Sequence, residues 1–279
     1  MTNFDPSEDF QDVIADRDQP LTIDQAIANL SGSDYGDRYY ASWWLGRFRV
    51  RTPQAVDALV ATLSDESDRT PEGGYPLRRN SARALGKLGD IRAVPALIEC
   101  LACTDYYVRE AAVQSLGALG DSTCIPMLIA LLDGGVAAAL PIPNCPHLAQ
   151  PYDAVLEALG ALGAREAVSV VEPFLAHPTE LVQYAAARAM YLLTGDTEYG
   201  DRLVAALAGD KLQLRRAALA DIGAIGYLKA AQPVAQTLAE NSLKLISLKG
   251  ILERQLEGTE PLTLSEDAVQ VMVLMDRLL

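Results

Sequence analysis

SARALGKLGD (residues 81–90) and AVQSLGALGD (residues 112–121) are near copies of each other, and the glycines that close them, Gly89 and Gly120, lie 31 residues apart. Related stretches follow as VLEALGALGA (155–164), ARAMYLLTGD (187–196) and LADIGAIGYL (219–228), and ASWWLGRFRV (41–50) precedes them. Self-similarity at a fixed spacing of roughly 20–50 residues is typical of repeat proteins. The repeat therefore decides the fold class before any single residue does.

Each repeat has the pattern of two helices. The first helix is rich in Ala and Leu and ends at a glycine, which suits a left-handed C-terminal cap. First helices are expected over 77–88, 108–119 and 181–193. Second helices, with apolar residues at helical spacing, are expected over 93–101, 123–132, 166–175, 198–207 and 229–238. One pair cannot bury its own apolar face, so the sequence predicts an all-α, HEAT-like solenoid of about six stacked helical pairs.

The ends of the chain differ from the middle. We expect an acidic N-terminal segment and cap over 1–33, the repeats over 34–258, and a C-terminal helix within 259–279. Roughly a dozen extra residues separate the first unit from the second, and again the third from the fourth. The C-terminal helix is apolar over more than one face, so it either caps the last repeat or is buried by a partner chain.

The excess of acidic over basic residues excludes some classes of binding partner. The 279 residues carry 37 acidic and 23 basic side chains, a formal net charge of −14. A chain this acidic repels phosphate backbones and anionic membrane surfaces, so neither is an expected partner. No apolar run is long enough to insert in a membrane, and the start lacks the pattern of a secretory signal. These features predict a cytoplasmic protein.

The four cysteines indicate neither a disulfide scaffold nor a metal site. Cys100 and Cys103 are one turn apart in a strongly helical segment rather than on a knuckle loop. Thiols in such a segment usually pack as small hydrophobic groups. No metal is therefore expected.

Aromatic and arginine side chains gather in a few places, which a repeat core does not explain. They are Trp43, Trp44 and Arg47 in the first unit; Tyr75, Arg78 and Arg79 at the end of the first insertion; Tyr106, Tyr107 and Arg109 at a helix start; Tyr152 after the second insertion; and Tyr184 with Arg188 on one helix. Such a set suits a flat, anionic, conjugated ligand, because aromatic faces stack on it and arginine forks take its carboxylates. The alternative is that the arginines pair with carboxylates of the neighbouring repeat.

The first-turn arginines share a position in successive repeats. Arg78, Arg79 and Arg109 all lie in the first turn of a first helix, and Arg215 with Arg216 falls at the same place. Stacking would line them up along one edge of the solenoid. Positive charge at a helix start opposes the helix dipole, so helix stability does not explain it.

Familiar catalytic motifs are absent from the sequence. It holds no nucleophile elbow, phosphate-cradling glycine loop or dinucleotide fingerprint. Of its two histidines, His177 is expected to cap a helix end. His147 lies in the proline-rich loop PIPNCPHLAQPY (141–152), close to Cys145. It is either an acid–base residue or a loop-packing residue.

Several of these stretches resemble a known family. RYYASWWLGRFRV (38–50), GGYPLRRNSARALGKLGD (73–90), DYYVREAAVQSLGALGD (105–121) and ENSLKLISLKGILE (240–253) are similar to the E-type subunits of heterodimeric phycocyanobilin lyases. The resemblance runs from about residue 34 to residue 253. The aromatic and arginine stretches and the two insertions carry it, because glycine-ended helices occur in HEAT repeats generally.

The resemblance implies a function that composition does not reach. Members of this family act as a heterodimer with a related F-type repeat subunit. They attach phycocyanobilin reversibly to a cysteine of the phycocyanin alpha subunit through a thioether, in the cytoplasm of cyanobacteria. Phycocyanobilin is then a substrate, and no permanently bound cofactor is expected. A sister branch couples attachment to isomerisation and gives phycoviolobilin.

The same resemblance suggests roles for the clustered residues. Arg78, Arg79 and Arg109 would hold the two propionates of the bilin, and aromatic faces would support its rings. Glu110 or Asp153 would pair with the pyrrole nitrogens, and His147 is a further acid–base candidate. The nucleophilic thiol belongs to the acceptor protein. The competing hypothesis is a non-catalytic chaperone or scaffold for phycobiliproteins.

Overall fold

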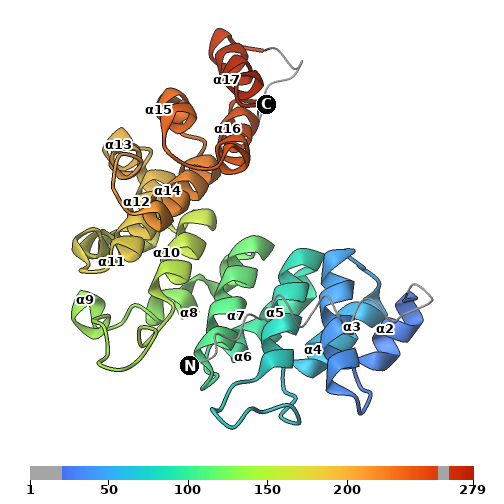
Figure 1. The fold of residues 1–279 in the computed structure, drawn as a ribbon. Coiled ribbons are helices and arrows are strands. Elements are labelled where there is room, and N and C mark those ends of the chain that lie inside the picture. The colour runs from blue at the N-terminus through green and yellow to red at the C-terminus, as the bar shows by residue number, and fades with distance from the viewer. Residues whose placement is uncertain (1–20, 257–263) are drawn as a thin grey trace.

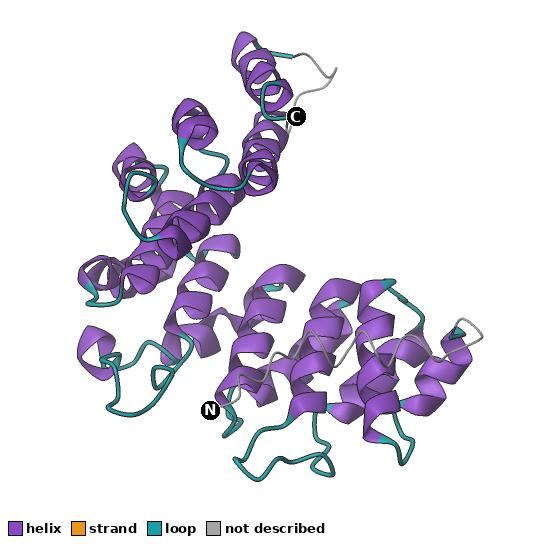
Figure 2. Ribbon diagram, viewed as in Figure 1, coloured by secondary structure: helices purple, strands orange, loops and turns teal. Residues whose placement is uncertain are grey.

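The computed structural model describes residues 21–256 and 264–279, and these ranges contain helices and loops without a strand (Figure 2). The predicted all-α repeat fold is confirmed. Most of the acidic segment predicted over 1–33, and the first residues of the predicted C-terminal unit, lie outside the described ranges. No helix in the described ranges is both long and apolar enough to cross a membrane.

Helical pairs follow one another along the chain, as the repeat pattern predicts. The first helices are α3 (Tyr35–Arg47), α5 (Pro76–Leu88), α7 (Tyr106–Leu119), α10 (Tyr152–Ala161), α12 (Glu180–Thr194), α14 (Leu212–Ile225) and α16 (Asn241–Leu256). The second helices are α4 (Pro53–Thr62), α6 (Val94–Cys100), α8 (Ile125–Ala130), α11 (Val168–Val171), α13 (Thr197–Ala206) and α15 (Ala231–Gln236). Short 3₁₀ turns adjoin several of them: η1 (Ile91–Ala93), η2 (Ser122–Cys124), η3 (Arg165–Ala167), η4 (Glu172–Ala176) and η5 (Leu228–Ala230). The six predicted units omit α16, which stacks on α14 as a further first helix.

The recurring Gly-Asp pair ends one helix and begins the next. Gly89 and Gly120 have φ of +72° and +75°, a left-handed conformation that glycine adopts without a Cβ penalty. Their amides donate to the carbonyl groups of Leu85 and Leu116, four residues earlier. The following Asp90 accepts a hydrogen bond from the amide of Arg92, at the start of η1. The motif thus encodes the tight turn that follows α5, α7 and α12, where Gly89-Asp90, Gly120-Asp121 and Gly195-Asp196 lie.

First helices approach one another through residues with little or no side chain. A Cβ added to Gly86 of α5 would lie 2.5 Å from Ser115 Oγ of α7. One added to Gly160 of α10 would lie 2.7 Å from the Cα of Ala189 on α12. Similar contacts recur at Gly46 with Ala84, Gly117 with Ala158, and Gly223 with Ser247. The small residues of the repeat are therefore packing positions, which set the spacing of the stack.

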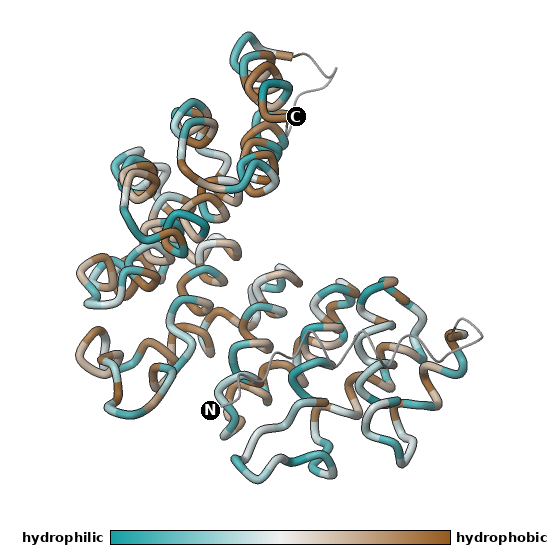
Figure 3. The backbone as a smooth tube through the Cα atoms, in the orientation of Figure 1, coloured by the Kyte–Doolittle hydropathy of each residue, from teal (hydrophilic) through white to brown (hydrophobic). Residues whose placement is uncertain are grey.

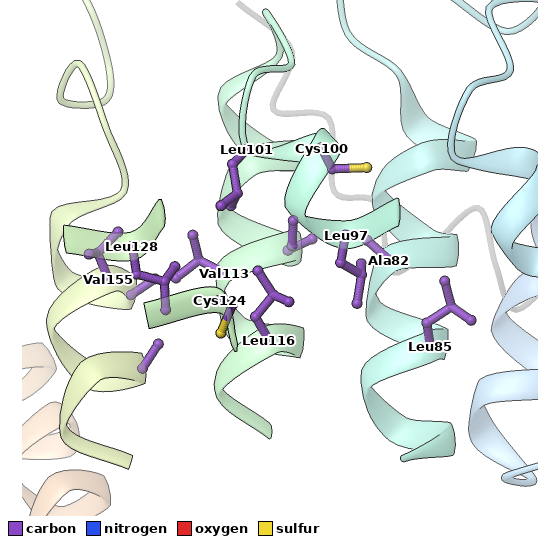
Figure 4. Packing of buried hydrophobic residues seen from close by; sticks show 14 of the residues in the cluster. Ala82, Leu85, Leu97, Cys100, Leu101, Val113, Leu116, Cys124, Leu128 and Val155 are labelled. Atoms are coloured by element: carbon purple, nitrogen blue, oxygen red, sulfur yellow. The ribbon is translucent and has the colours of Figure 1, made fainter. Parts of the chain in front are cut away.

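The core runs between the two layers of helices and passes from one repeat to the next. Figure 4 shows Leu85 of α5, Leu97 of α6 and Leu116 of α7 in one continuous row, and all three are fully buried. Apolar backbone segments gather where helices face each other, and polar ones follow the connecting loops (Figure 3). Cys100 and Cys124 belong to this core, and burial raises the pKa of the Cys100 thiol to about 12. These cysteines are buried thiols, as expected.

Helices at the two ends close the stack. At one end α2 (Ile23–Asn29) packs on α3 and α4, and its capping box joins Thr22 to Gln25. At the other end α17 (Glu266–Asp276) packs on α16 and α15 and buries Ala268 and Val271. Of the two roles expected for the C-terminal helix, the described residues show the capping role.

The described chain forms a bent row of helices. In Figure 1 the helices from α2 to α8 make one arm, and those from α12 to α17 make the second, with the bend at α10. The two insertions, 63–75 and 133–151, hang from the same edge of this row (Figure 1). The second contains the short helix α9 (Gly135–Ala138). Both insertions therefore lie at the N-terminal ends of first helices.

Candidate functional site

The sides of the first helices that do not pack in the core carry charged residues in neighbouring repeats, and we call these sides the first-helix face. On α5 it carries Arg79, Arg83 and Lys87, four residues apart and therefore on one side of the helix. On α7 it carries Glu110, and on α10 it carries Asp153 and Glu157. Charges of both signs thus lie side by side across three neighbouring repeats.

A hollow of about 410 Å³ lies where the two insertions meet the start of α5 and α7, and we call it the aromatic hollow. Tyr75, Arg79, Tyr106, Tyr107 and His147 are among the residues that line it. The ring of Tyr106 stacks on His147 with centroids 4.1 Å apart and planes 11° apart. Tyr107 meets the same imidazole edge-on at 6.1 Å. The hollow therefore offers flat aromatic surfaces beside a cation.

Backbone contacts hold the aromatic hollow in place. The amide of Tyr75 donates to Asp105 Oδ2 at 2.7 Å, which ties the first insertion to the start of α7. The imidazole Nδ1 of His147 lies 2.9 Å from the carbonyl oxygen of Leu148 and 3.5 Å from Cys145 Sγ. An imidazole that donates to a carbonyl through Nδ1 keeps Nε2 as its basic atom. The imidazole Nε2 lies 3.9 Å from Cys145 Sγ, so both ring nitrogens have contacts within the loop, and of the two expectations for His147 the contacts show the packing one.

Arg79 is the predicted arginine that reaches the aromatic hollow. Its Nη2 lies 3.4 Å from the hydroxyl of Tyr39, and its guanidinium lies 5.8 Å from the centre of the Tyr107 ring. Its buried Nε has no hydrogen-bond partner among the described residues. Buried donors are almost always satisfied, so an unpaired one beside a hollow indicates a place for an acceptor.

Arg78 and Arg109 have a different role. Arg78 donates to the carbonyl oxygens of Ser64 and Asp65, and its guanidinium stacks over Tyr75 at 4.0 Å. Arg109 donates to the carbonyls of Cys103 and Ala149 and to Gln150 Oε1. Most of their donors therefore bind backbone at helix ends and insertions. This geometry weighs against the prediction that they hold ligand carboxylates.

The structure confirms that these arginines occupy the same position, in the first turn of successive first helices. In several repeats they bind the segment that precedes the helix. Like Arg78 and Arg109, Arg38 and Arg215 donate to carbonyls that follow the preceding helix, those of Leu30 and Gly209. Helix C-termini leave carbonyl oxygens unpaired, and arginine satisfies several of them at once. These arginines fasten α3, α5, α7 and α14 to the segments that precede them.

A second cluster crosses the middle of the first-helix face. Arg188 on α12 binds Glu157 of the preceding first helix at 3.0 Å and Asp221 of the following one at 3.2 Å. Here the alternative expectation, pairing between neighbouring repeats, is confirmed. Burial raises the pKa of Glu157 to about 7 and that of Asp221 to about 6, and Arg188 only partly offsets this.

Glu110 extends this cluster toward α5. Its carboxylate lies 3.7 Å from Arg83 Nη2 and is half-buried. Burial, with the negative charge of Asp153 nearby, raises the pKa of Glu110. Carboxyl groups with raised pKa values can hold a proton near neutral pH and deliver it. The middle of the face can therefore supply acid assistance.

The remaining predicted binding residues fall into two groups. Trp43 is 40% exposed and stacks on Tyr40, and Arg47 lies one turn further along α3 on the same face. By contrast Tyr152 is 2% exposed and packs on Phe174 within the core. Trp44 and Tyr184 also pack against the core, although neither is fully enclosed. The structure brings together Arg79, Tyr75, Tyr106, Tyr107 and His147, with Glu110 and Asp153 further along the face.

Sequence reasoning missed Arg83, Glu157 and Asp221. Arg83 and Glu157 each lie four residues after a predicted residue, Arg79 and Asp153, so helical spacing could have found them. Asp221 stands in the apolar run of α14, and a carboxylate there is a signal because it is costly to bury without a partner. His177, fully buried, is the C-cap of η4 as predicted, since its amide donates to the Phe174 carbonyl, and its ring Nδ1 accepts a hydrogen bond from the amide of Thr179.

Comparisons with known proteins show which family the chain belongs to. The family model of HEAT repeats matches residues 23–117 and 74–139. The phycocyanobilin lyase subunit alpha of Microchaete diplosiphon is 64% identical over 267 residues, which cover 94% of this chain and 91% of that protein. This chain belongs to the family of phycocyanobilin lyase alpha subunits.

Other members of the phycocyanobilin lyase alpha family agree. The alpha subunit of Pseudanabaena tenuis is 63% identical over 94% of this chain and 97% of its own length. The solved complex of CpcE and CpcF of phycocyanin lyase from Nostoc sp. matches with a TM-score of 0.88 at 60% identity, over 95% of this chain and 97% of that one. The bilin biosynthesis protein PecE of Nostoc sp. is 46% identical over 85% of this chain. The chain is thus more similar to the lyase alpha subunits than to that relative.

Proposed function

We propose that this chain is the alpha subunit of a lyase that attaches phycocyanobilin to a cysteine of the phycocyanin alpha subunit, and detaches it in the reverse reaction. The observation that carries the proposal is 64% identity to a phycocyanobilin lyase alpha subunit along nearly the whole chain. The first-helix face supports it, because aromatic surfaces, cations and proton-holding carboxyl groups occur together there.

The reaction is an addition, and its atoms balance without an oxidant or a reductant. The acceptor thiol adds across a carbon–carbon double bond of the bilin, so a carbon–sulfur bond forms and one proton ends on the bilin. The nucleophile comes from the acceptor, so no cysteine of this chain takes part. The chain's contribution is to position the bilin and assist protonation.

Named residues divide this work. The rings of Tyr106 and Tyr107, with the imidazole of His147, offer faces on which a conjugated tetrapyrrole stacks. Glu110, Asp153 and Glu157 lie across the same face, where a carboxylate can pair with pyrrole nitrogens and favour the protonated bilin. A protonated bilin is the better electrophile, so this pairing accelerates thiol addition.

The proposal includes a partner subunit and a cellular location. An F-type subunit completes the enzyme, which a structural match to a complex of CpcE and CpcF supports. The heterodimer acts in the cytoplasm on the newly made phycocyanin alpha subunit. Phycocyanobilin is bound as a substrate, and the chain carries no resident cofactor.

Co-expression tests the proposal directly. The chain is produced with an F-type subunit, apo-phycocyanin alpha and phycocyanobilin, and the mixture is denatured and separated by electrophoresis. We expect bilin fluorescence on the alpha band, lost when this chain is omitted. The absorbance of the product separates phycocyanobilin from phycoviolobilin, the product of the lyase-isomerase alternative. An unlabelled band, with both subunits soluble and associated, would replace the lyase by a chaperone or scaffold.

A further inference from the structure

A second hollow, of about 550 Å³, opens at the opposite ends of α5 and α7 from the aromatic hollow. Arg49, Arg51, Arg83 and Lys87 line it, together with Gly86, Gly89 and other small or uncharged residues and no carboxylate. We call it the basic hollow. Four cations around one concavity are unusual in a chain whose net charge is −14.

Most of the charge in the basic hollow is uncompensated. No hydrogen bond or ion pair within the described residues engages the side chains of Arg49, Arg51 or Lys87. Arg83 has one carboxylate within reach, Glu110, at the long distance of 3.7 Å. Like charges held near each other repel, so the cluster weakens the free fold unless an anion occupies it.

Two residues that line the basic hollow, Arg49 and Gly89, have a positive φ. Arg49 has a φ of +50°, a left-handed conformation that few residues other than glycine adopt and that costs on the order of 1 kcal/mol. The guanidinium of Arg51 lies beside Gly89, 3.6 Å from where a Cβ of that residue would be, which is an ordinary contact distance. Arg49 and Arg51, two residues apart in the segment that follows α3, both line the hollow.

The basic hollow and the aromatic hollow lie along the same helix, α5. Arg79 lines the aromatic hollow, Lys87 lines the basic hollow, and Arg83 lies between them on the same side of α5. At 1.5 Å per residue, Arg79 and Lys87 lie about 12 Å apart along the helix. A ligand that stacks on the aromatic hollow and extends along α5 therefore reaches the basic hollow with its anionic part.

We propose that the basic hollow binds the propionate carboxylates of the bilin, through Arg51, Lys87 and Arg83. This inference rests on the proposed lyase function and assigns the carboxylate contacts to residues other than Arg78 and Arg109, whose donors bind backbone carbonyls. Guanidinium and ammonium groups form short, charge-assisted hydrogen bonds to carboxylates, and arginine can bind both oxygens at once.

The test uses the complex of this chain with an F-type subunit and two probes: phycocyanobilin and its dimethyl ester, in which the propionate charges are removed. The variant combines Arg51→Gln with Lys87→Gln. The matched control combines Arg165→Gln with Lys249→Gln, which removes two charges from exposed positions that line neither hollow. The bilin concentration that gives half-maximal attachment is measured for each protein and each probe.

We expect the variant to need at least about tenfold more free phycocyanobilin than the wild type, because two charge-assisted contacts are lost. The wild type should need about tenfold more ester than free acid, whereas the variant should no longer distinguish the two. The control should behave as the wild type does. Equal thermal unfolding of variant and wild type would separate this result from misfolding.

Two results would overturn the inference. One is a variant that keeps the wild-type preference for the free acid. The other is a variant that no longer co-elutes with the F-type subunit in gel filtration, which would make the hollow a protein contact. If the wild type attaches no bilin, the proposed function fails instead. The inference is then decided by absorbance titration of the purified complex with free acid and ester, where equal binding of the two rejects it.

Discussion

The guanidinium of Arg188 on α12 lies 3.0 Å from the carboxylate of Glu157 on α10, one repeat earlier in the chain. The same nitrogen lies 3.2 Å from Asp221 on α14, one repeat later. One side chain thus joins three successive first helices. Because the Asp221 side chain is only 8% exposed, its charge depends on this contact.

Replacement of Arg188 by Met should therefore destabilise the fold by about 3 kcal/mol, since it leaves Asp221 buried without a cation. Arg216→Met is the control, because Arg216 pairs with Glu240 at a more exposed position and such pairs contribute about 0–1 kcal/mol. Urea unfolding followed by circular dichroism measures both. Equal losses for the two variants would mean that Asp221 does not need its partner.

The stability of the fold should depend on pH through Glu157. Burial raises its pKa from the ordinary value of 4.5 to about 7, so the folded protein holds this proton more tightly than the unfolded chain does. The stabilisation is complete below about 4.5 and is lost as the pH rises toward 7. We expect the free energy of unfolding of the wild type, relative to Glu157→Gln, to fall from pH 5 to pH 7. A difference that stays constant with pH, or rises, would contradict the raised pKa.

Arg78 and Arg109 should anchor different insertions. Arg78 holds the carbonyls of Ser64 and Asp65 in the first, and Arg109 holds Ala149 and Gln150 in the second. Arg78→Met should speed proteolytic cleavage within 63–75 and leave 133–151 protected, and Arg109→Met should do the reverse. Each variant is the control for the other. Loss of protection at both insertions in either variant would indicate general unfolding instead.

Substitutions of Tyr107 and Tyr152 should have different effects, because Tyr107 lines the candidate site and Tyr152 packs in the core. Tyr152→Ala should cost about 3–5 kcal/mol of stability, because its ring is buried against Phe174. Tyr107→Ala should change stability by less than about 1 kcal/mol, because the ring is 43% exposed, and should reduce bilin attachment. Thermal unfolding and the co-expression assay measure the two effects. A Tyr107 variant with full attachment would remove that ring from the site.

The fold could be predicted from the sequence because its signals are local. A glycine with positive φ followed by an aspartate cap ends one helix and begins the next within a few residues, as at Gly89 and Asp90, Gly120 and Asp121, and Gly195 and Asp196. The extra pair α16 and α17 was not predicted as a repeat, because the stretch ILERQL (251–256) does not resemble the glycine-ended stretches of the other first helices. Where the local signal is missing, only packing on α14 shows the repeat.

The candidate site could be predicted only in part, because it depends on how repeats are rotated and aligned. Arg78 and Arg79 are neighbours in the chain, yet one binds carbonyls of the preceding loop and the other lines the aromatic hollow. A helix turns about 100° per residue, so adjacent side chains point in different directions. Likewise Arg188 and Asp221 meet across 33 residues, a contact that the helix register sets.

First helices touch at small residues, such as Gly86 with Ser115 and Gly160 with Ala189. These contacts set a regular spacing between neighbouring helices of the stack. Each added helix advances the surface by about 8–10 Å, the usual distance between packed helices. The separation between the cations of α5 and the Arg188 cluster on α12 is therefore a whole number of such steps. Gaining or losing a repeat between α5 and α12 would change the distance between these two charge clusters by one full step, and a methyl group added at Gly86 or Gly160 would push two neighbouring helices apart.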